Sequence, residues 1–321
     1  MSNKELVIKL REASKFIPDT IPQDIVYGDM PGDQIKIDES HLLKSKVIFE
    51  ALVKEMINLV EHENSDKLVL CVCGGSGVGK SEIASLLSSF FEMGGIGSYT
   101  LSGDNYPHRI PKYNDAERLS IYRRNGLQAL LTEEAYNSEN AAILKQLQMQ
   151  NQDADLSLRQ SYPWLATYIK SGKEALQNYL GTDKEIDFRE IERVVQQFKD
   201  RSDKIWLKRM GRELTDIWYD QIDFSSVNVL IIEWTHGNSN YYQGVDIPIL
   251  LHSTPKETAE HRKARKRDGN TDSGFVTLVL EIEQDMLRRQ AEKAKVIVSK
   301  EGKILSYDAY KNQINEEERH E

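Results

Sequence analysis

The chain has 321 residues, which is enough for one large domain or two ordinary ones. Its 42 lysines and arginines against 51 aspartates and glutamates give a net charge of −9, which disfavours a nucleic-acid surface but allows local clusters that bind small anions. No apolar run approaches the roughly 18 to 20 residues of a membrane span, and the polar N-terminus does not resemble a signal peptide. We therefore expect a cytoplasmic protein that binds neither nucleic acid nor membrane.

Residues 1–66 are expected to form a helical extension. Residues 1–37 are polar and contain three prolines that would break any long helix. Between residues 39 and 63 the apolar side chains fall roughly on one helical face, at Leu43, Val47, Ala51, Met56 and Val60. This helix should pack on the sheet of the domain that follows.

The stretch from Lys67 to Ser81 carries the strongest pattern in the chain. Residues 67–73 are a short apolar run, rich in β-branched residues, of the kind that forms a buried strand. Residues 74–81 fit G-x-x-x-x-G-K-[ST], and the apolar residues from Ile83 to Phe91 have the spacing of an amphipathic helix. Strand, glycine loop and helix therefore arrive in the order that a phosphate-binding loop needs.

This motif predicts a site for a nucleoside triphosphate. Its glycines let the backbone N–H groups face a phosphate chain at a helix N-terminus. Lys80 would reach the β- and γ-phosphates, and the Ser81 hydroxyl would bind Mg²⁺. The residues predicted to bind the nucleotide are Gly74, Gly75, Ser76, Gly77, Val78, Gly79, Lys80 and Ser81.

A polar run follows the next predicted strand, Ser98–Ser102. Ligands of open α/β sheets bind at this end of the strands. Asp104 could accept the proton of an attacking hydroxyl, or it could merely cap the turn. Tyr106, His108 and Arg109 would offer hydrogen-bond donors to a polar substrate.

Residues 115–220 have a helical and polar pattern without a convincing strand. Parallel strands need a connection of only a dozen or more residues, so we interpret this far longer one as a helical insertion that builds a substrate lobe. One of its helices is expected near residues 204–220, carrying Leu207, Met210, Leu214, Ile217 and Trp218.

Val227–Ile232 is the next clear strand, and Glu233-Trp-Thr-His-Gly237 follows it. A carboxylate at Glu233 would lie beside the glycine loop, where it could hold Mg²⁺ through water or bind a substrate hydroxyl. Its alternative role is to cap the strand end. His236 is either a substrate ligand or a satisfied polar residue.

The rest of the chain alternates strands and helices. Strands are expected at residues 246–251 and 295–299, and helices at 256–268, 273–292 and 315–321. Pro248 places its strand near an edge or lies among its first residues. The alternation predicts an α/β P-loop NTPase fold of three layers with a mostly parallel sheet. Its core would be residues 67–114 and 221–321, around the insertion at 115–220.

The segment from His261 to Arg267 holds five cations in seven residues. On a helix, Arg262, Arg265 and Lys266 share one face and could clamp transferring phosphates. Gly269 would then be a hinge for closure of this lid. The alternative is a solvated charged face.

Together these stretches resemble the phosphoribulokinase and uridine kinase group of P-loop kinases. That group has a P-loop strand, a strand ending in a short Asp-containing motif, a strand ending in Glu-Gly, and an arginine-rich lid. The resemblance implies that Asp104 is the base for the substrate hydroxyl and that Glu233 lies near metal and substrate. It places Arg262, Arg265 and Arg267 in the lid, and we expect Arg267 to contact the nucleotide.

The resemblance covers residues 67–109 and 226–300, and the insertion matches no pattern of the group. Trp234 departs from it by standing where the group has glycine after the glutamate. A second resemblance is to the adenylylsulfate kinases, through residues 103–108, Asn114–Arg118 and Tyr122–Arg124. Both families share the fold and transfer a γ-phosphoryl group to a hydroxyl.

We therefore expect an ATP- and Mg²⁺-dependent kinase that phosphorylates a hydroxyl of a sugar, a sugar acid or a nucleoside. Mg²⁺ would bind Ser81 and, through water, Glu233 or Asp104. The alternatives are an adenylylsulfate kinase and a nucleotide-driven regulatory ATPase without a small-molecule acceptor. The expected partner is a small-molecule substrate, and a homodimer is one option for its assembly.

Overall fold

The computed structural model describes residues 1–320 except 34, 64, 214, 255 and 261–272. By its internal contacts the chain divides into two compact units. The first unit comprises Met1–Tyr106, Phe188–Thr254 and Leu287–Glu321, and the second comprises Pro107–Asp187 and Pro255–Met286. The predicted division into a core and an insertion at 115–220 stays a prediction.

A six-stranded sheet forms the centre of the first unit, in the order β2-β5-β1-β6-β7-β8. The first five strands are parallel to their neighbours, and β8 runs antiparallel to β7. This confirms the expected mostly parallel α/β sheet. The strands are β1 (Leu68–Gly74), β2 (Gly97–Ser102), β5 (Val227–Glu233), β6 (Ile247–Leu251), β7 (Val296–Val298) and β8 (Ile304–Leu305). Pro248 is the second residue of β6, which lies inside the sheet and not at its edge.

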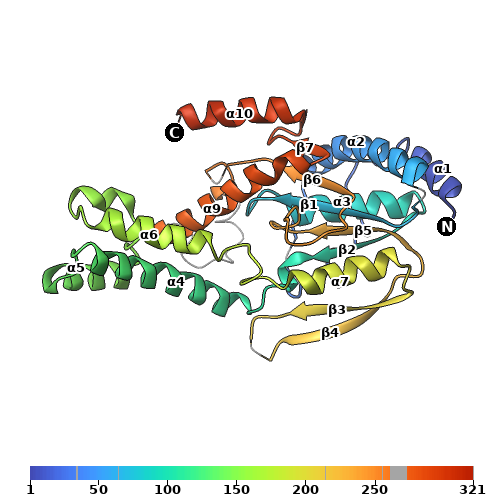
Figure 1. The fold of residues 1–321 in the computed structure, drawn as a ribbon. Helices are drawn as coiled ribbons and strands as arrows, with labels where there is room; N and C mark the ends of the chain where they lie inside the picture. Colours follow the sequence, from blue (N-terminus) through green and yellow to red (C-terminus); the bar gives the residue numbers. More distant parts are fainter. Residues whose placement is uncertain (34, 64, 214, 255, 261–272, 321) are drawn as a thin grey trace. The chain divides into compact units, whose positions relative to one another are not determined.

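Helices cover both faces of this sheet. On one face α1 (Asn3–Ala13), α2 (Glu39–Glu63) and α3 (Lys80–Met93) pack together, with Leu70 and Val72 of β1 in their core (Figure 1). The alternate residues Cys71 and Cys73 face the other side, against Leu287 of α9 (Gly274–Gln290), η3 (Ala291–Lys293) and α10 (Tyr307–His320). The three-layer architecture is therefore confirmed.

Helix α2 has the predicted bounds but buries a different face. Leu43 and Val47, expected in the core, are 63% and 39% exposed, whereas Phe49 is fully buried. The ring of Phe49 contacts those of Phe90 and Phe91 on α3, with centroid distances of 5.4 and 5.0 Å. These aromatic contacts fix the rotation of α2 about its axis.

Residues 204–220 do not form the predicted helix. They contribute β3 (Lys204–Met210) and β4 (Ile217–Asp223), which pair as an antiparallel hairpin. Along β3, Ile205 and Leu207 are buried while Trp206 between them is half-exposed, an alternation of period two. The hairpin is tied to α7 (Phe188–Lys199), where Arg193 donates a hydrogen bond to the Trp206 carbonyl at 2.7 Å.

The second unit is helical. It contains η2 (Leu156–Gln160), most of α9, and three further helices: α4 (Pro111–Thr132), α5 (Ser138–Met149) and α6 (Leu165–Gln177). Its core includes the rings of Tyr122 and Tyr168, which meet edge to face at 5.5 Å. The helical pattern predicted for this part of the chain is confirmed.

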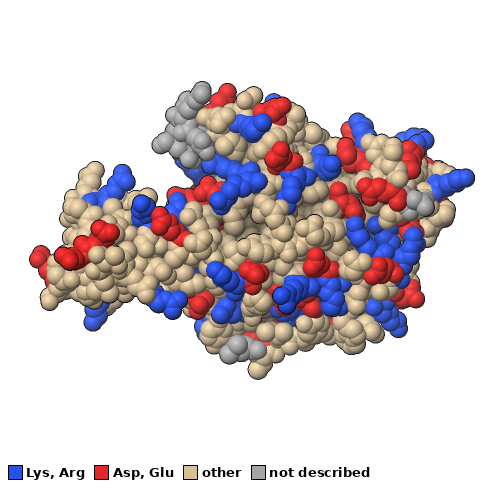
Figure 2. Space-filling view, viewed as in Figure 1, with Lys and Arg blue, Asp and Glu red and all other residues tan. Residues whose placement is uncertain are grey.

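None of the described helices is long and apolar enough to span a membrane. On the face drawn in Figure 2, basic and acidic side chains are interspersed and do not gather into one large patch of a single sign. The expected absence of a nucleic-acid surface stays a prediction.

The packing of α2 can be tested by exchanging two of its residues. Phe49→Ala should lower the free energy of unfolding by about 3–5 kcal/mol, because it removes a fully buried ring between α2 and α3. Leu43→Ala, on the exposed side of the same helix, should change it by less than about 0.5 kcal/mol. Urea unfolding measures both, and equal losses would contradict the observed orientation of α2.

Candidate functional site

The glycine loop connects β1 to α3, as the motif predicts. Gly77 and Gly79 have φ angles of 78° and 96°, in the region that favours glycine. A Cβ on Gly74 would lie only 2.6 Å from the Leu251 carbonyl oxygen, so a side chain has no room there. Lys80 begins α3 and its Nζ donates to the Gly75 carbonyl at 3.1 Å. The loop is thus a backbone cradle that fits a phosphate chain.

The carboxylate of Glu233 lies at the end of β5, the strand between β1 and β2. Glu233 is the last residue of β5, and its neighbours across the sheet are Val72 on β1 and Ser102 on β2. Its Oε2 accepts a hydrogen bond from the Ser81 hydroxyl at 3.1 Å, and its Oε1 accepts one from the Ser102 hydroxyl at 2.8 Å. The side chain is 5% exposed. Glu233 therefore connects the phosphate-binding loop to the end of β2.

The electrostatics of this group follow from its surroundings. Burial, together with the nearby charge of Asp104, raises the pKa of Glu233 to about 7, while Lys80 and the two serine donors act in the opposite direction. Asp104 itself lies in the short η1 turn (Gly103–Asn105) that follows β2, and it is exposed. Two carboxylates and one lysine thus share the region beside the loop.

This donor set fits Mg²⁺ when the metal also binds phosphate oxygens. The described residues contain no cluster of three or more His, Cys, Asp or Glu side chains that could hold a metal alone. Mg²⁺ commonly binds one or two carboxylates, waters and substrate phosphates. The Ser81 hydroxyl and the carboxylates of Glu233 and Asp104 would be its protein ligands, directly or through water.

Trp234 stands where the phosphoribulokinase and uridine kinase group has glycine. Its side chain fills the space beside the η1 turn. A Cβ on Gly103 would lie 2.0 Å from the Trp234 Cγ, so glycine at 103 and tryptophan at 234 fit each other. The Trp234 indole is buried and packs edge-on to the ring of His236 at 5.4 Å and against Phe188 at 5.6 Å. The departure therefore has a packing reason.

The predicted substrate residues have different surroundings. Tyr106 is fully buried, and its hydroxyl has no hydrogen-bond partner among the described residues. His236 is 8% exposed. His108 and Arg109 belong to the second unit, where a His108 ring nitrogen lies 3.0 Å from the Asp183 carbonyl oxygen and Arg109 donates to the Tyr179 hydroxyl at 3.0 Å. Their place in one substrate site stays a prediction.

The lid residues Arg262, Arg265 and Arg267 lie outside the described residues, so their role is also a prediction. Two arginines of the second resemblance form ion pairs within the second unit: Arg118 with the buried Glu185, and Arg123 with Asp153 at 2.8 Å.

Sequence reasoning missed two groups that surround the site. Ser102 directly precedes the predicted Asp104 turn, so its position at a strand end could have drawn attention to it. His41 on α2 lies against the glycine loop, where a Cβ on Gly79 would be 3.1 Å from its ring. Nothing local in the sequence links residues 41 and 79.

The chain matches no family model. Over 239 residues it is 37% identical to the bifunctional α-galactosidase/sucrose kinase of Mediterraneibacter gnavus. This match covers 74% of the chain and 21% of that relative, so the chain corresponds to about one fifth of the larger protein.

Two solved structures are also similar. A candidate fructose transport system kinase from Silicibacter shares 13% identity, covering 76% of this chain and 93% of its own, with a TM-score of 0.44. A candidate uridine kinase from Bacillus stearothermophilus shares 16% identity, covering 77% and 98%, with a TM-score of 0.33.

The buried state of Glu233 predicts a pH dependence of stability. The folded protein binds the Glu233 proton more tightly than the unfolded chain does, because the pKa is raised from 4.5 to about 7. This contribution to stability is present below about pH 4.5 and is lost as the pH rises through about 7. In EDTA, Glu233→Gln should therefore gain stability relative to the wild type between pH 5 and pH 8, by about 1–3 kcal/mol. Urea unfolding across this range measures the difference, and a difference independent of pH would contradict the assignment.

By its phosphate-binding loop, its parallel sheet and the sequence that it shares with a sucrose kinase relative, the chain is similar to P-loop kinases of small molecules.

Proposed function

We propose that the protein is an ATP- and Mg²⁺-dependent kinase that transfers the γ-phosphoryl group to a hydroxyl of a sugar. The observation that carries this proposal is the Glu233 carboxylate, which is bound to the Ser81 hydroxyl of the phosphate-binding loop and lies beside Asp104. The relative is named as a sucrose kinase in part, which favours a sugar over a nucleoside or a sugar acid. Sucrose is therefore the first acceptor to test.

The two carboxylates are suited to different roles. Glu233 is buried and accepts hydrogen bonds from two serines, so it orients Ser81 and cannot readily reach an incoming hydroxyl. Asp104 is exposed on the turn after β2 and is accessible to a substrate. We therefore assign the role of general base to Asp104.

In the proposed step, Asp104 takes the proton of the acceptor hydroxyl as its oxygen bonds to the γ-phosphorus. The bond from that phosphorus to the oxygen bridging the β- and γ-phosphates breaks, and ADP leaves. Lys80 and the loop N–H groups hold the β- and γ-phosphates, while Ser81 and Glu233 contribute to the metal site. When bound, Mg²⁺ would neutralise part of the phosphate charge.

The remaining predicted residues complete the proposal. Arg262 and Arg265 would stabilise charge on the transferring group, and Arg267 would contact the nucleotide. Tyr106, His108, Arg109 and His236 are proposed to contact the acceptor.

Two other functions are retained as outcomes of the test. Adenylylsulfate is the less favoured acceptor, because Arg118 and Arg123 are engaged by the carboxylates of Glu185 and Asp153. A regulatory ATPase would need no small-molecule acceptor and would hydrolyse ATP at a rate that metabolites leave unchanged. Only a kinase is expected to bind a small-molecule acceptor more tightly when an ATP analogue is present.

The proposal is tested by a binding screen followed by a transfer assay. Thermal shifts would be recorded with sucrose, other sugars, sugar acids, nucleosides and adenylylsulfate, each with and without Mg²⁺ and a non-hydrolysable ATP analogue. We expect a sugar to raise the melting temperature, more strongly with the analogue present. Transfer to that sugar is then measured with the wild type and Lys80→Ala, which should be inactive. Stabilisation by adenylylsulfate alone, or by no acceptor, would contradict a sugar kinase.

The role of Asp104 can be tested with a matched control. Asp104→Asn keeps the size of the side chain but removes the proton acceptor, so kcat should fall by roughly 10²- to 10⁴-fold with little change in ATP affinity. Asp308→Asn removes an exposed carboxylate of α10 that pairs only with Lys311 in the described residues, and it should leave kcat unchanged. Single-turnover transfer and calorimetric ATP binding are the measurements. Normal transfer by Asp104→Asn would make Asp104 a turn cap and Glu233 the next candidate base.

A further inference from the structure

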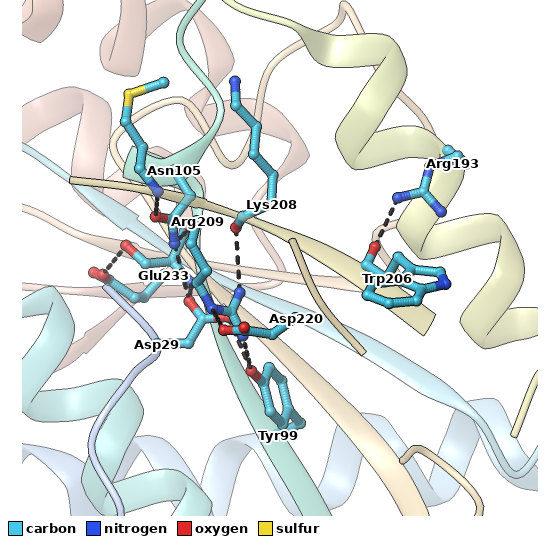
Figure 3. A network of polar contacts seen from close by, with 11 residues as sticks. Asp29, Tyr99, Asn105, Arg193, Trp206, Lys208, Arg209, Asp220 and Glu233 are labelled. Carbon is cyan, nitrogen blue, oxygen red and sulfur yellow. Dashed lines mark hydrogen bonds and ion pairs between the residues drawn. The ribbon is translucent and has the colours of Figure 1, made fainter. Parts of the chain in front are cut away.

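A buried carboxylate from the N-terminal extension reaches the end of β2. Asp29, in the segment between α1 and α2, has a side chain that is 9% exposed. Its Oδ1 accepts hydrogen bonds from the Ser102 backbone N–H at 2.7 Å and from the Asn105 side-chain amide at 3.3 Å. Its Oδ2 accepts from the Tyr99 hydroxyl at 3.0 Å and from Arg209 Nη1 at 2.9 Å (Figure 3). One carboxylate thus binds both ends of the turn that carries Asp104.

Arg209, the charged partner of Asp29, comes from β3 and is held from several sides. Its Nη2 donates to the Tyr99 hydroxyl at 2.9 Å, and its Nε donates to Asp220 on β4 at 3.1 Å. The neighbouring backbone N–H of Met210 donates to the Asn105 side-chain oxygen at 2.9 Å. The hairpin therefore contacts the same turn, and these hydrogen bonds hold Arg209 in place before any substrate binds.

Ser102 connects this cluster to the phosphate-binding loop. Its backbone N–H is bound to Asp29, and its hydroxyl donates to Glu233, which in turn accepts from Ser81. A continuous path of hydrogen bonds therefore leads from Asp29 through Ser102 and Glu233 to Ser81. Both candidate carboxylates of the site, Asp104 and Glu233, depend on the position of residues 102–105.

We propose that Asp29, paired with Arg209, is a positioning residue for phosphoryl transfer. It holds the Ser102–Asn105 turn so that Asp104 and Glu233 keep their places beside the glycine loop. Asp29 is buried and does not touch the substrate itself. This inference rests on the proposed kinase function and adds a residue outside the stretches by which the chain resembles known kinases.

The chemistry of Asp29 favours such a role over simple packing. Burial raises the pKa of Asp29 to about 6, although Arg209, the Ser102 N–H and the Tyr99 hydroxyl act in the opposite direction. Keeping a carboxylate in so buried a place is costly, and buried ion pairs are often replaceable by apolar residues without loss of stability. An apolar residue would leave four hydrogen-bond donors without an acceptor, namely the Ser102 N–H, the Asn105 amide, the Tyr99 hydroxyl and Arg209.

A matched control lies near the other end of the strands. Asp66 precedes β1, has a side chain that is 3% exposed, and accepts a hydrogen bond from Arg201 at 3.0 Å. Its backbone carbonyl accepts from Asn228, the second residue of β5. Asp66 is therefore a buried aspartate in the same unit that pairs with an arginine, here the 59% exposed Arg201, without a described contact to the 102–105 turn.

The experiment compares Asp29→Asn, Tyr99→Phe and Asp66→Asn with the wild type. For Asp29→Asn we expect kcat to fall by about 10- to 100-fold, the scale of a misplaced catalytic group, with KM for ATP within about twofold of wild type. Tyr99→Phe removes one donor to Asp29 and should show a smaller loss in the same direction. Asp66→Asn should keep kcat within about twofold, whatever its effect on the melting temperature. An equal loss of kcat in Asp66→Asn and Asp29→Asn, or normal kcat in Asp29→Asn, would overturn the proposal.

Hydrogen exchange gives a readout that needs no substrate. Amides in a peptide covering residues 99–106 should exchange faster in Asp29→Asn than in the wild type, and at an unchanged rate in Asp66→Asn. Unchanged exchange in Asp29→Asn would overturn the positioning role even if activity is lost. If Asp29→Asn does not fold, Tyr99→Phe is judged by the same two measurements. A wild-type protein that transfers no phosphoryl group to any sugar would refute the proposed acceptor, while the exchange result would still decide whether Asp29 orders the turn.

Discussion

The structure of the site depends on two hydrogen bonds to one carboxylate. Glu233 accepts from Ser81 at the start of α3 and from Ser102 at the end of β2, while its own strand lies between β1 and β2. The end of β5, the end of β2 and the first turn of α3 are thereby linked through one buried carboxylate. A proposed catalytic carboxylate, Asp104, can then be presented from a turn of only three residues without losing its position.

The fold could largely be predicted wherever the deciding contacts are local. The strand, loop and helix from Leu68 to Met93 have the expected order because periodicity and glycine placement act within a few residues. The sequence predicts a helix near residues 204–220 because Leu207, Met210 and Ile217 match helical spacing, whereas these residues lie in the β3–β4 hairpin. Pairing between β3 and β4, together with the contact of α7 on β3, overrides that pattern, and neither contact is visible in a window of sequence.

The candidate site was predictable to a similar degree. Residues in the loop and at strand ends, such as Lys80, Asp104 and Glu233, follow directly from motif and position, although their catalytic roles stay predictions. Asp29 could not be found in this way, since it lies 73 residues from Ser102 and its segment has no motif. The contact between Asp29 of the N-terminal extension and the end of β2 becomes apparent only once the chain is folded.

The most direct test of the central claim is to follow the γ-phosphorus of ATP by ³¹P NMR while the wild-type protein turns over with Mg²⁺ and a sugar. The account predicts that the γ-phosphate signal is replaced by that of a sugar phosphate ester, in equal amount to the ADP formed, and only when the sugar is present. Release of inorganic phosphate at a rate that no sugar changes would contradict the account and would leave a nucleotide hydrolase.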